Sequence, residues 1–190
     1  MKTIAALLLL VFFAAIAGAA TPDSGNDPVV SVEIKDGVVY TKAEVAIPAS
    51  AREVWEVFTD FDNLPRYISS VTSSKVLSRN GNLLRVAQTG KGGFGPFTFE
   101  FKTVRDVTLS PFEKFESRMI EGNMKRMSST TSFEPNAGVT RVHYVAESVP
   151  DTSLPLGLAR STIESSTREH FMEMAREVLR RKSLAAAKPQ

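Results

Sequence analysis

Residues Ile47–Ile68 read IPASAREVWEVFTDFDNLPRYI and decide how the rest of the chain is arranged. Ser50 and Glu53 form an S-x-x-E capping box, in which each side chain accepts a backbone N–H at the start of a helix. The next turns carry an apolar stripe at the spacing of one helical face: Val54, Trp55, Val57, Phe58 and Phe61. The stretch therefore begins with a short amphipathic helix, and we expect Trp55 to pack between that helix and a sheet.

The same stretch then breaks and restarts within four residues. We interpret Thr59 and Asp60 as the end of the first helix, and Asp62 as the cap of a second short helix. Pro65 falls in the first turn of that second helix, where the missing N–H has no helical partner in any case. Two short helices that meet at an angle are expected to turn Phe61 inward at the corner. Capping is also the preferred interpretation of the Asp60 and Asp62 carboxylates, rather than a paired-carboxylate catalytic site.

Runs of β-branched and aromatic residues predict strands on both sides of this corner. Turn signals such as Asp36-Gly37 and Asn80-Gly81 separate the runs. Strict alternation of phenylalanine with polar residues from Phe97 to Lys102 is typical of a half-buried antiparallel strand. The predicted strands are Val29–Ile34, Val38–Ile47, Ser73–Ser78, Leu83–Thr89, Phe97–Leu109, Lys114–Glu121, Met124–Phe133 and Val139–Val149.

A glycine-rich segment, Gly90–Pro96 (GKGGFGP), separates two of these strands and is expected to be a flexible loop. It lacks the G-K-[ST] ending and the following helix that a phosphate-binding loop needs. Two interpretations stay open: a long hairpin connection, or a lid over a cavity mouth with Phe94 as its apolar plug.

The C-terminal part predicts one long helix over Leu158–Arg181, followed by a frayed tail at Ser183–Gln190. Its apolar face is formed by Ile163, Thr167, Phe171, Met174 and Val178. A sheet with one apolar face must bury it, and this helix is the long element available to cover it. The order predicts an α+β fold in which a curved antiparallel sheet wraps around the long helix and leaves a hollow between them.

The N-terminus reads as a targeting segment. Lys2 precedes the apolar run Ile4–Ala20, and Ala17-Gly18-Ala19 matches a small-residue cleavage pattern. We therefore expect a signal peptide at 1–19, a flexible lead-in at 20–28, and one ligand-binding domain at 29–182. A retained membrane anchor is the alternative. The expected location is outside the cytoplasm, secreted or periplasmic.

Composition excludes several classes of function. The 190 residues contain no cysteine, which rules out disulfides, thiolate catalysis and cysteine-based zinc sites. There are 23 Lys and Arg against 21 Asp and Glu, and removal of Lys2 would leave 22 against 21. A nucleic-acid partner is not expected, because such proteins carry a strong basic bias.

Three segments resemble the START-like or SRPBCC superfamily, in particular its polyketide cyclase/dehydrase and coenzyme Q-binding branch. They are VWEVFTDFDNLPRYISSV, GNMKRMSSTTSFEPNAGVTRVHYV and PLGLARSTIESSTREHFMEMAREVL, and the resemblance spans Val38–Arg181. It implies the helix-grip fold, in which a curved antiparallel sheet surrounds a long C-terminal helix. It also implies an internal cavity for an apolar small molecule. Some relatives bind isoprenoid quinones or lipids, and others act on polyketides.

The expected lining of that cavity comes from the inward faces of the predicted strands and helix. Ser129 and Thr131 share such a face, and their hydroxyls either bond to the backbone or orient a ligand. Methionines on these faces suit varied apolar ligands and irregular cores equally well. The predicted ligand-binding residues are Phe99, Phe101, Phe115, Met119, Met127, Thr131, Tyr144, Ile163, Thr167, Phe171 and Met174.

Catalytic and metal-binding patterns are weak. His143 and His170 are the two histidines, and we interpret both as surface or boundary residues. Arg85 and Arg105 lie in strands, and their orientation stays open. Surface placement is favoured, whereas an arginine turned into a cavity would have to be paired or bind a ligand carboxylate. No cofactor, metal or catalytic residue is predicted.

These observations predict an exported carrier that holds a hydrophobic small molecule, lipid or isoprenoid-like, with at most transient membrane contact. A cyclase or dehydratase acting on a polyketide-like substrate is the alternative, and it would need an inward carboxylate or histidine with a shifted pKa. A protein-interaction module with a filled core is a third possibility.

Overall fold

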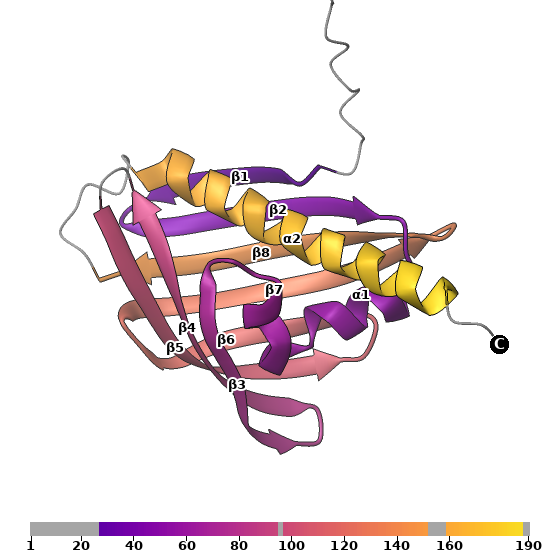
Figure 1. The fold of residues 1–190 in the computed structure, drawn as a ribbon. Coiled ribbons are helices and arrows are strands. Elements are labelled where there is room, and N and C mark those ends of the chain that lie inside the picture. The colour runs from indigo at the N-terminus through magenta and orange to yellow at the C-terminus, as the bar shows by residue number, and fades with distance from the viewer. Residues whose placement is uncertain (1–26, 95–96, 152–158, 188–190) are drawn as a thin grey trace, which may run out of the picture.

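One curved sheet and one long helix account for most of the structure, as the sequence predicts (Figure 1). This computed structural model describes residues 27–94, 97–151 and 159–187, with the side chains of 93–99 left out. The predictions for the signal peptide, for most of the lead-in and for the Phe94 plug lie outside the described residues. No helix in the described part is both long and apolar enough to cross a membrane.

Eight antiparallel strands form the sheet in the order β1-β2-β8-β7-β6-β5-β4-β3. The crossover from β2 to β3 passes through the two short helices, so that β3 lies at the edge opposite β1. The strands are β1 Val29–Lys35, β2 Val38–Ile47, β3 Val71–Asn80, β4 Leu83–Phe94, β5 Phe97–Ser110, β6 Lys114–Gly122, β7 Met124–Asn136 and β8 Val139–Pro150.

The prediction of a flexible loop at Gly90–Pro96 is wrong for most of that segment. Strand β4 continues to Phe94 and pairs with β5 along that length. The glycine at 90 has a packing reason, because a Cβ there would lie 2.2 Å from the Phe101 ring and 2.4 Å from the Ser70 carbonyl oxygen. Close approach of a ring and a backbone, rather than loop flexibility, explains this glycine.

The corner consists of the two short helices that the sequence predicts, and only the role of Asp62 differs. Helix α1 spans Ala51–Phe58, and the 3₁₀ helix η1 spans Phe61–Arg66. Both halves of the capping box are present: Glu53 N donates to Ser50 Oγ (3.3 Å), and Ser50 N donates to Glu53 Oε2 (2.7 Å).

The correction concerns Asp62, which does not cap η1. Asp60 holds the N-cap position without a side-chain cap bond. Asp62 Oδ1 instead accepts the backbone N–H of Val76 at 2.7 Å and ties η1 to β3. Phe61 is buried, as predicted.

Helix α2 spans Arg160–Ala186 and lies across β1 and β2, with its C-terminal half against α1 (Figure 1). The tail expected at Ser183–Gln190 is wrong in its first part, because the helix continues through Ala186. Arg168 donates to the Pro28 carbonyl, and Lys182 Nζ donates to the Pro48 carbonyl at 2.6 Å. Both ends of the helix are thereby tied to the first two strands.

An ion network closes the C-terminal end of α2 onto the corner. Glu177 is buried and accepts bonds from Arg180 Nε (2.6 Å) and Arg181 Nε (2.7 Å). Arg181 also donates to Asp60 Oδ2 at 2.8 Å. The bond from Arg180 lowers the pKa of Glu177 to about 2, against the opposing effect of burial and with further help from Arg181.

We expect Glu177→Gln to lower the free energy of unfolding at pH 7 by about 2 kcal/mol, because two guanidinium groups lose their shared carboxylate. The depressed pKa means that wild-type stability from this group is present above pH 4.5 and is lost as the pH falls towards 2. Urea unfolding at pH 7 and pH 3 measures both effects. Glu169→Gln on the exposed side of α2 is the control, and an equal loss in both variants would contradict this account.

Candidate functional site

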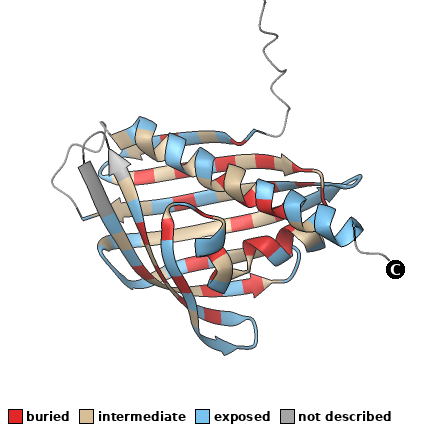
Figure 2. Ribbon diagram, viewed as in Figure 1, coloured by how far each residue is buried: buried red, intermediate tan, exposed pale blue. Residues whose placement is uncertain are grey.

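The concave face of the sheet has a tightly packed half and an open half. Beneath α1 and the C-terminal half of α2, inward residues such as Val45, Val142, Phe171 and Val178 are at most 5% exposed. In Figure 2 the buried residues of the helices lie on α1 and on the part of α2 near it, whereas the N-terminal part of α2 is half-buried or exposed.

The open half lies beneath the N-terminal part of α2. Its side chains point inward by strand alternation or helix face, yet each stays partly accessible, so the helix does not seal this part of the sheet. Its residues are Phe101, Arg105, Met119, Met127, Ser129 and Tyr144 from the sheet, and Ile163, Thr167 and His170 from α2.

The structure distributes the predicted lining residues between these two halves. Phe101, Met119, Met127, Tyr144, Ile163 and Thr167 lie in the open half, and Phe101 and Tyr144 also pack against the edge of the core. Phe115, Thr131, Phe171 and Met174 lie in or against the packed half, where they contact other core side chains. The side chain of Phe99 lies outside the described part of the chain.

A polar strip crosses the open half on strands β3 to β6. Ser74 lies opposite Gln88, and Gln88 accepts a hydrogen bond at 2.6 Å from Nη2 of Arg105. Arg105 lies between Val86 on β4 and Met119 on β6, so its immediate cross-strand neighbours are apolar. We define the polar strip as Ser74, Gln88, Arg105 and Ser117.

Three members of this strip each carry one buried polar atom without a hydrogen-bond partner. Among the described residues, the buried side-chain atoms without a hydrogen bond are Ser74 Oγ, Arg105 Nε and Ser117 Oγ. Buried polar atoms are normally satisfied, and each exception calls for an explanation. All three exceptions face the concave side, which is where a bound molecule would lie.

The prediction that Arg105 faces solvent is wrong. The alternation that turns Phe101 inward also turns Thr103, Arg105 and Val107 inward, so the signal was present in the strand itself. Its neighbour Asp106 faces outward and pairs with Arg85 at 2.8 Å, which confirms the expectation for Arg85. Arg105 thus keeps an inward position, although arginine side chains usually prefer contact with water.

Tyr144 and His170 complete the polar groups of the open half. Burial raises the pKa of Tyr144, and Arg105 and a hydrogen bond with Ser129 partly offset this. Burial lowers the pKa of His170 to about 4, while Glu173 raises it and Arg105 lowers it. Both side chains are therefore neutral near pH 7. His170 is half-buried, in line with its interpretation as a boundary residue, and its ring centroid lies 5.9 Å from that of Phe171.

Other candidates from the sequence stay outside this site. His143 faces the outer side of the sheet, where Glu44 and Glu134 each approach it to 3.3 Å. No cluster of three or more metal-ligating side chains occurs in the described ranges.

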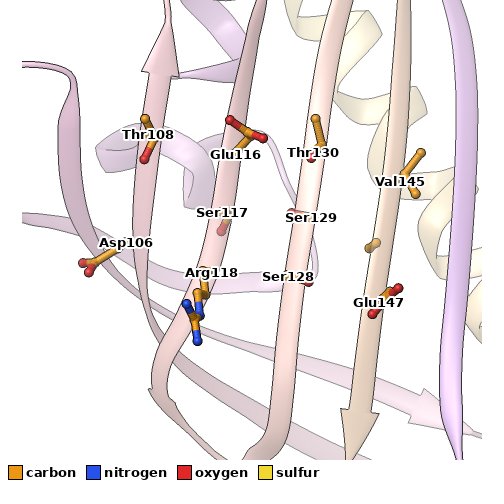
Figure 3. A pocket seen from close by; sticks show the side chains of 11 residues that line it. Asp106, Thr108, Glu116, Ser117, Arg118, Ser128, Ser129, Thr130, Val145 and Glu147 are labelled. Carbon is orange, nitrogen blue, oxygen red and sulfur yellow. The ribbon is translucent and has the colours of Figure 1, made fainter.

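Two surface depressions are not lined by the apolar side chains of the open half, although Ser117 and Ser129 contribute to the first of them. One, of about 470 Å³, is on the outer face of strands β5 to β8, and Figure 3 views it with the helices behind the sheet. Its rim carries charges of both signs, including Asp106, Arg118 and Glu147. The other, of about 370 Å³, surrounds the ion network of Glu177 and Arg181. Their open, charged linings do not suit an apolar ligand.

The curved antiparallel sheet around a long C-terminal helix makes this a protein of the helix-grip fold. The chain belongs to the family described as "Polyketide cyclase / dehydrase and lipid transport", whose model matches residues 47–174. No curated protein matches the chain.

Solved structures share the fold at low sequence identity. A protein of Thermus thermophilus is 23% identical with a TM-score of 0.63, over 78% of this chain and 99% of that one. The Zhui aromatase/cyclase of a Streptomyces species is 15% identical with a TM-score of 0.65, over 76% and 95%. A STAR-related lipid transfer protein of Xanthomonas axonopodis is 16% identical with a TM-score of 0.65, over 84% and 96%. At these identities the likeness shows the fold alone.

Proposed function

We propose that the protein binds a hydrophobic small molecule, lipid or isoprenoid-like, in the open half of the concave face and carries it through water. The observation that supports this most is the set of inward side chains that α2 leaves partly accessible, including Phe101, Met119, Met127 and Ile163. An apolar surface that folding leaves uncovered gains free energy when a ligand covers it. The family and the lipid transfer protein among the structural neighbours agree with this class of ligand.

Burial of the ligand, without bond-making, would supply most of the affinity. At about 25 cal/mol per Å² of apolar surface, covering on the order of 300 Å² would contribute about 7 kcal/mol before the entropy cost of binding. The polar strip would then fix the orientation of the ligand, as in pockets that are mostly apolar with a few placed polar groups.

We also propose that the carrier works outside the cytoplasm. Support comes from the sequence alone, namely Lys2, the apolar run after it, and Ala17-Gly18-Ala19. N-terminal sequencing of protein from an exported fraction would test this proposal. A start near Ala20 is expected, and a full-length chain confined to the cytoplasm would contradict it.

We expect a bulky residue in the open half to displace the ligand. Thr167 lies on the α2 face one turn before Phe171, and Thr167→Trp should lower ligand occupancy at least tenfold, because the indole fills the space. Ser165→Trp on the exposed side of the same helix is the matched control. Native mass spectrometry of the purified proteins, followed by organic extraction, measures occupancy and ligand class. Equal occupancy in both variants would contradict this placement of the site.

A cyclase-type enzyme is the second candidate, and one observation favours it. Arg105, Tyr144 and His170 all face the open half, and the neutral His170 ring can accept a proton, although burial, which lowers its pKa, also makes it a weaker base. Deuterium incorporation at the carbon between two carbonyls of a β-diketone would report proton abstraction. Acceleration by the wild type and its loss in His170→Gln would support the enzyme. Equal rates with and without protein would leave the carrier function.

A further inference from the structure

We propose that the ligand is an amphiphile with a carboxylate head, and that Arg105 binds this carboxylate inside the protein. This inference rests on the proposed carrier function and adds the chemistry of the ligand's polar end. The starting observation is the place of Arg105, which points from the middle of β5 into the concave face between Val86 and Met119.

The positive charge of Arg105 has no counter-ion in the described structure. Gln88 accepts its one hydrogen bond there, and an amide brings no negative charge. Tyr144 approaches closely enough to interact with the charge, but the phenol stays neutral because burial raises its pKa. An arginine remains protonated at neutral pH even in an apolar setting. No described residue therefore compensates the charge of Arg105, and a bound anion would do so.

Glu173 is the carboxylate that acts on the neighbouring His170, and it is already engaged. Its Oε2 accepts the backbone N–H of Ser69 at 3.1 Å. No ion pair joins Glu173 to Arg105 among the described residues. Glu173 therefore does not supply the partner that the guanidinium lacks, and an anionic group of a ligand can take that place.

The unused donors fit a carboxylate. Arg105 Nε is buried without a partner, and one of the five guanidinium N–H groups is used by Gln88. The guanidinium is planar, and its paired donors match the two oxygens of a carboxylate.

The remainder of the open half requires the other end of the ligand to be apolar. Phe101 lies on the inward face of β5, Met119 lies opposite Arg105 on β6, and Ile163 is half-buried on α2. A free inorganic anion would leave these side chains uncovered, so the head group must carry a hydrocarbon chain or ring.

Two probes of equal chain length test this inference: laurate, which has a carboxylate, and 1-dodecanol, which does not. We expect the wild type to bind laurate at least tenfold more tightly in isothermal titration calorimetry. Arg105→Gln should weaken laurate binding by about 10- to 100-fold and change dodecanol binding by less than about twofold, because only the charged hydrogen bonds are lost. Arg85→Gln, on the outer face, should change neither.

The outcomes separate this inference from the proposed function. Dodecanol and laurate binding equally to the wild type would overturn the carboxylate and leave the apolar carrier standing. An Arg105→Gln variant that loses both probes equally while keeping its thermal unfolding midpoint would also overturn the carboxylate contact. Binding of neither probe to the wild type would overturn both. The wild-type comparison decides the question even if the variant does not fold.

Discussion

Phe133→Ala should lower the free energy of unfolding by about 4 kcal/mol, the largest loss that we expect from a single side chain. The Phe133 ring is buried on the inner face of β7. Its centroid lies 5.6 Å from Trp55 and 5.6 Å from Phe58 on α1, and 6.1 Å from Phe115 on β6. Truncation removes the apolar surface that joins helix to sheet and leaves a cavity that stiff aromatic neighbours cannot fill.

Phe112→Ala is the matched control for this measurement. The Phe112 ring also approaches Trp55, at 5.9 Å, but the residue is 40% exposed. Its loss should cost less than about 1 kcal/mol, because little buried surface disappears. Urea unfolding of both variants followed by far-UV circular dichroism makes the comparison. Similar losses would mean that the packed half does not depend on this aromatic contact.

Local sequence patterns explain why the fold was predictable. Strand alternation, the Ser50–Glu53 capping box and the α2 stripe are local patterns whose periods differ between helix and strand, so they indicate element type directly. The errors arose at residues whose role depends on tertiary contacts, which no local pattern reveals. Gly90 resembles a loop residue, yet it serves a close approach of Ser70 and Phe101. Asp62 resembles a cap, yet it bonds to a strand 14 residues away.

The candidate site was predictable only in its apolar part. The alternation of side chains along each strand correctly placed Met119 and Tyr144 on the concave face. The same alternation applies to Arg105, but the cost of burying a charge favoured surface placement there. Local physics predicts that an inward charge is unfavourable, so a sequence pattern alone favours the surface. Where a protein keeps a charge inside despite the cost of burying it, we expect that the charge serves function at the expense of stability.

Acidification should weaken the fold through His170. The neutral form is favoured in the native state, where burial lowers the pKa to about 4, and the ordinary value of 6.5 applies to the unfolded chain. Between these two values the unfolded chain binds a proton that the native protein does not. The free energy of unfolding therefore falls as the pH drops from 6.5 to 4, by about 3 kcal/mol from this one residue. Below pH 4 both states are protonated, and this contribution levels off.

His170→Gln removes the titrating ring and should abolish the loss in that window, whereas His143→Gln on the outer face should retain it. The measurement is the urea midpoint of each variant at pH 7, 5.5 and 4.5, above the range in which Glu177 titrates. Glu173 and Arg105 also act on the His170 ring, and their opposed effects leave burial as the main cause. A wild-type midpoint that stays constant from pH 7 to 4.5 would mean that water reaches the ring, and hence that the open half is more hydrated than its apolar neighbours suggest.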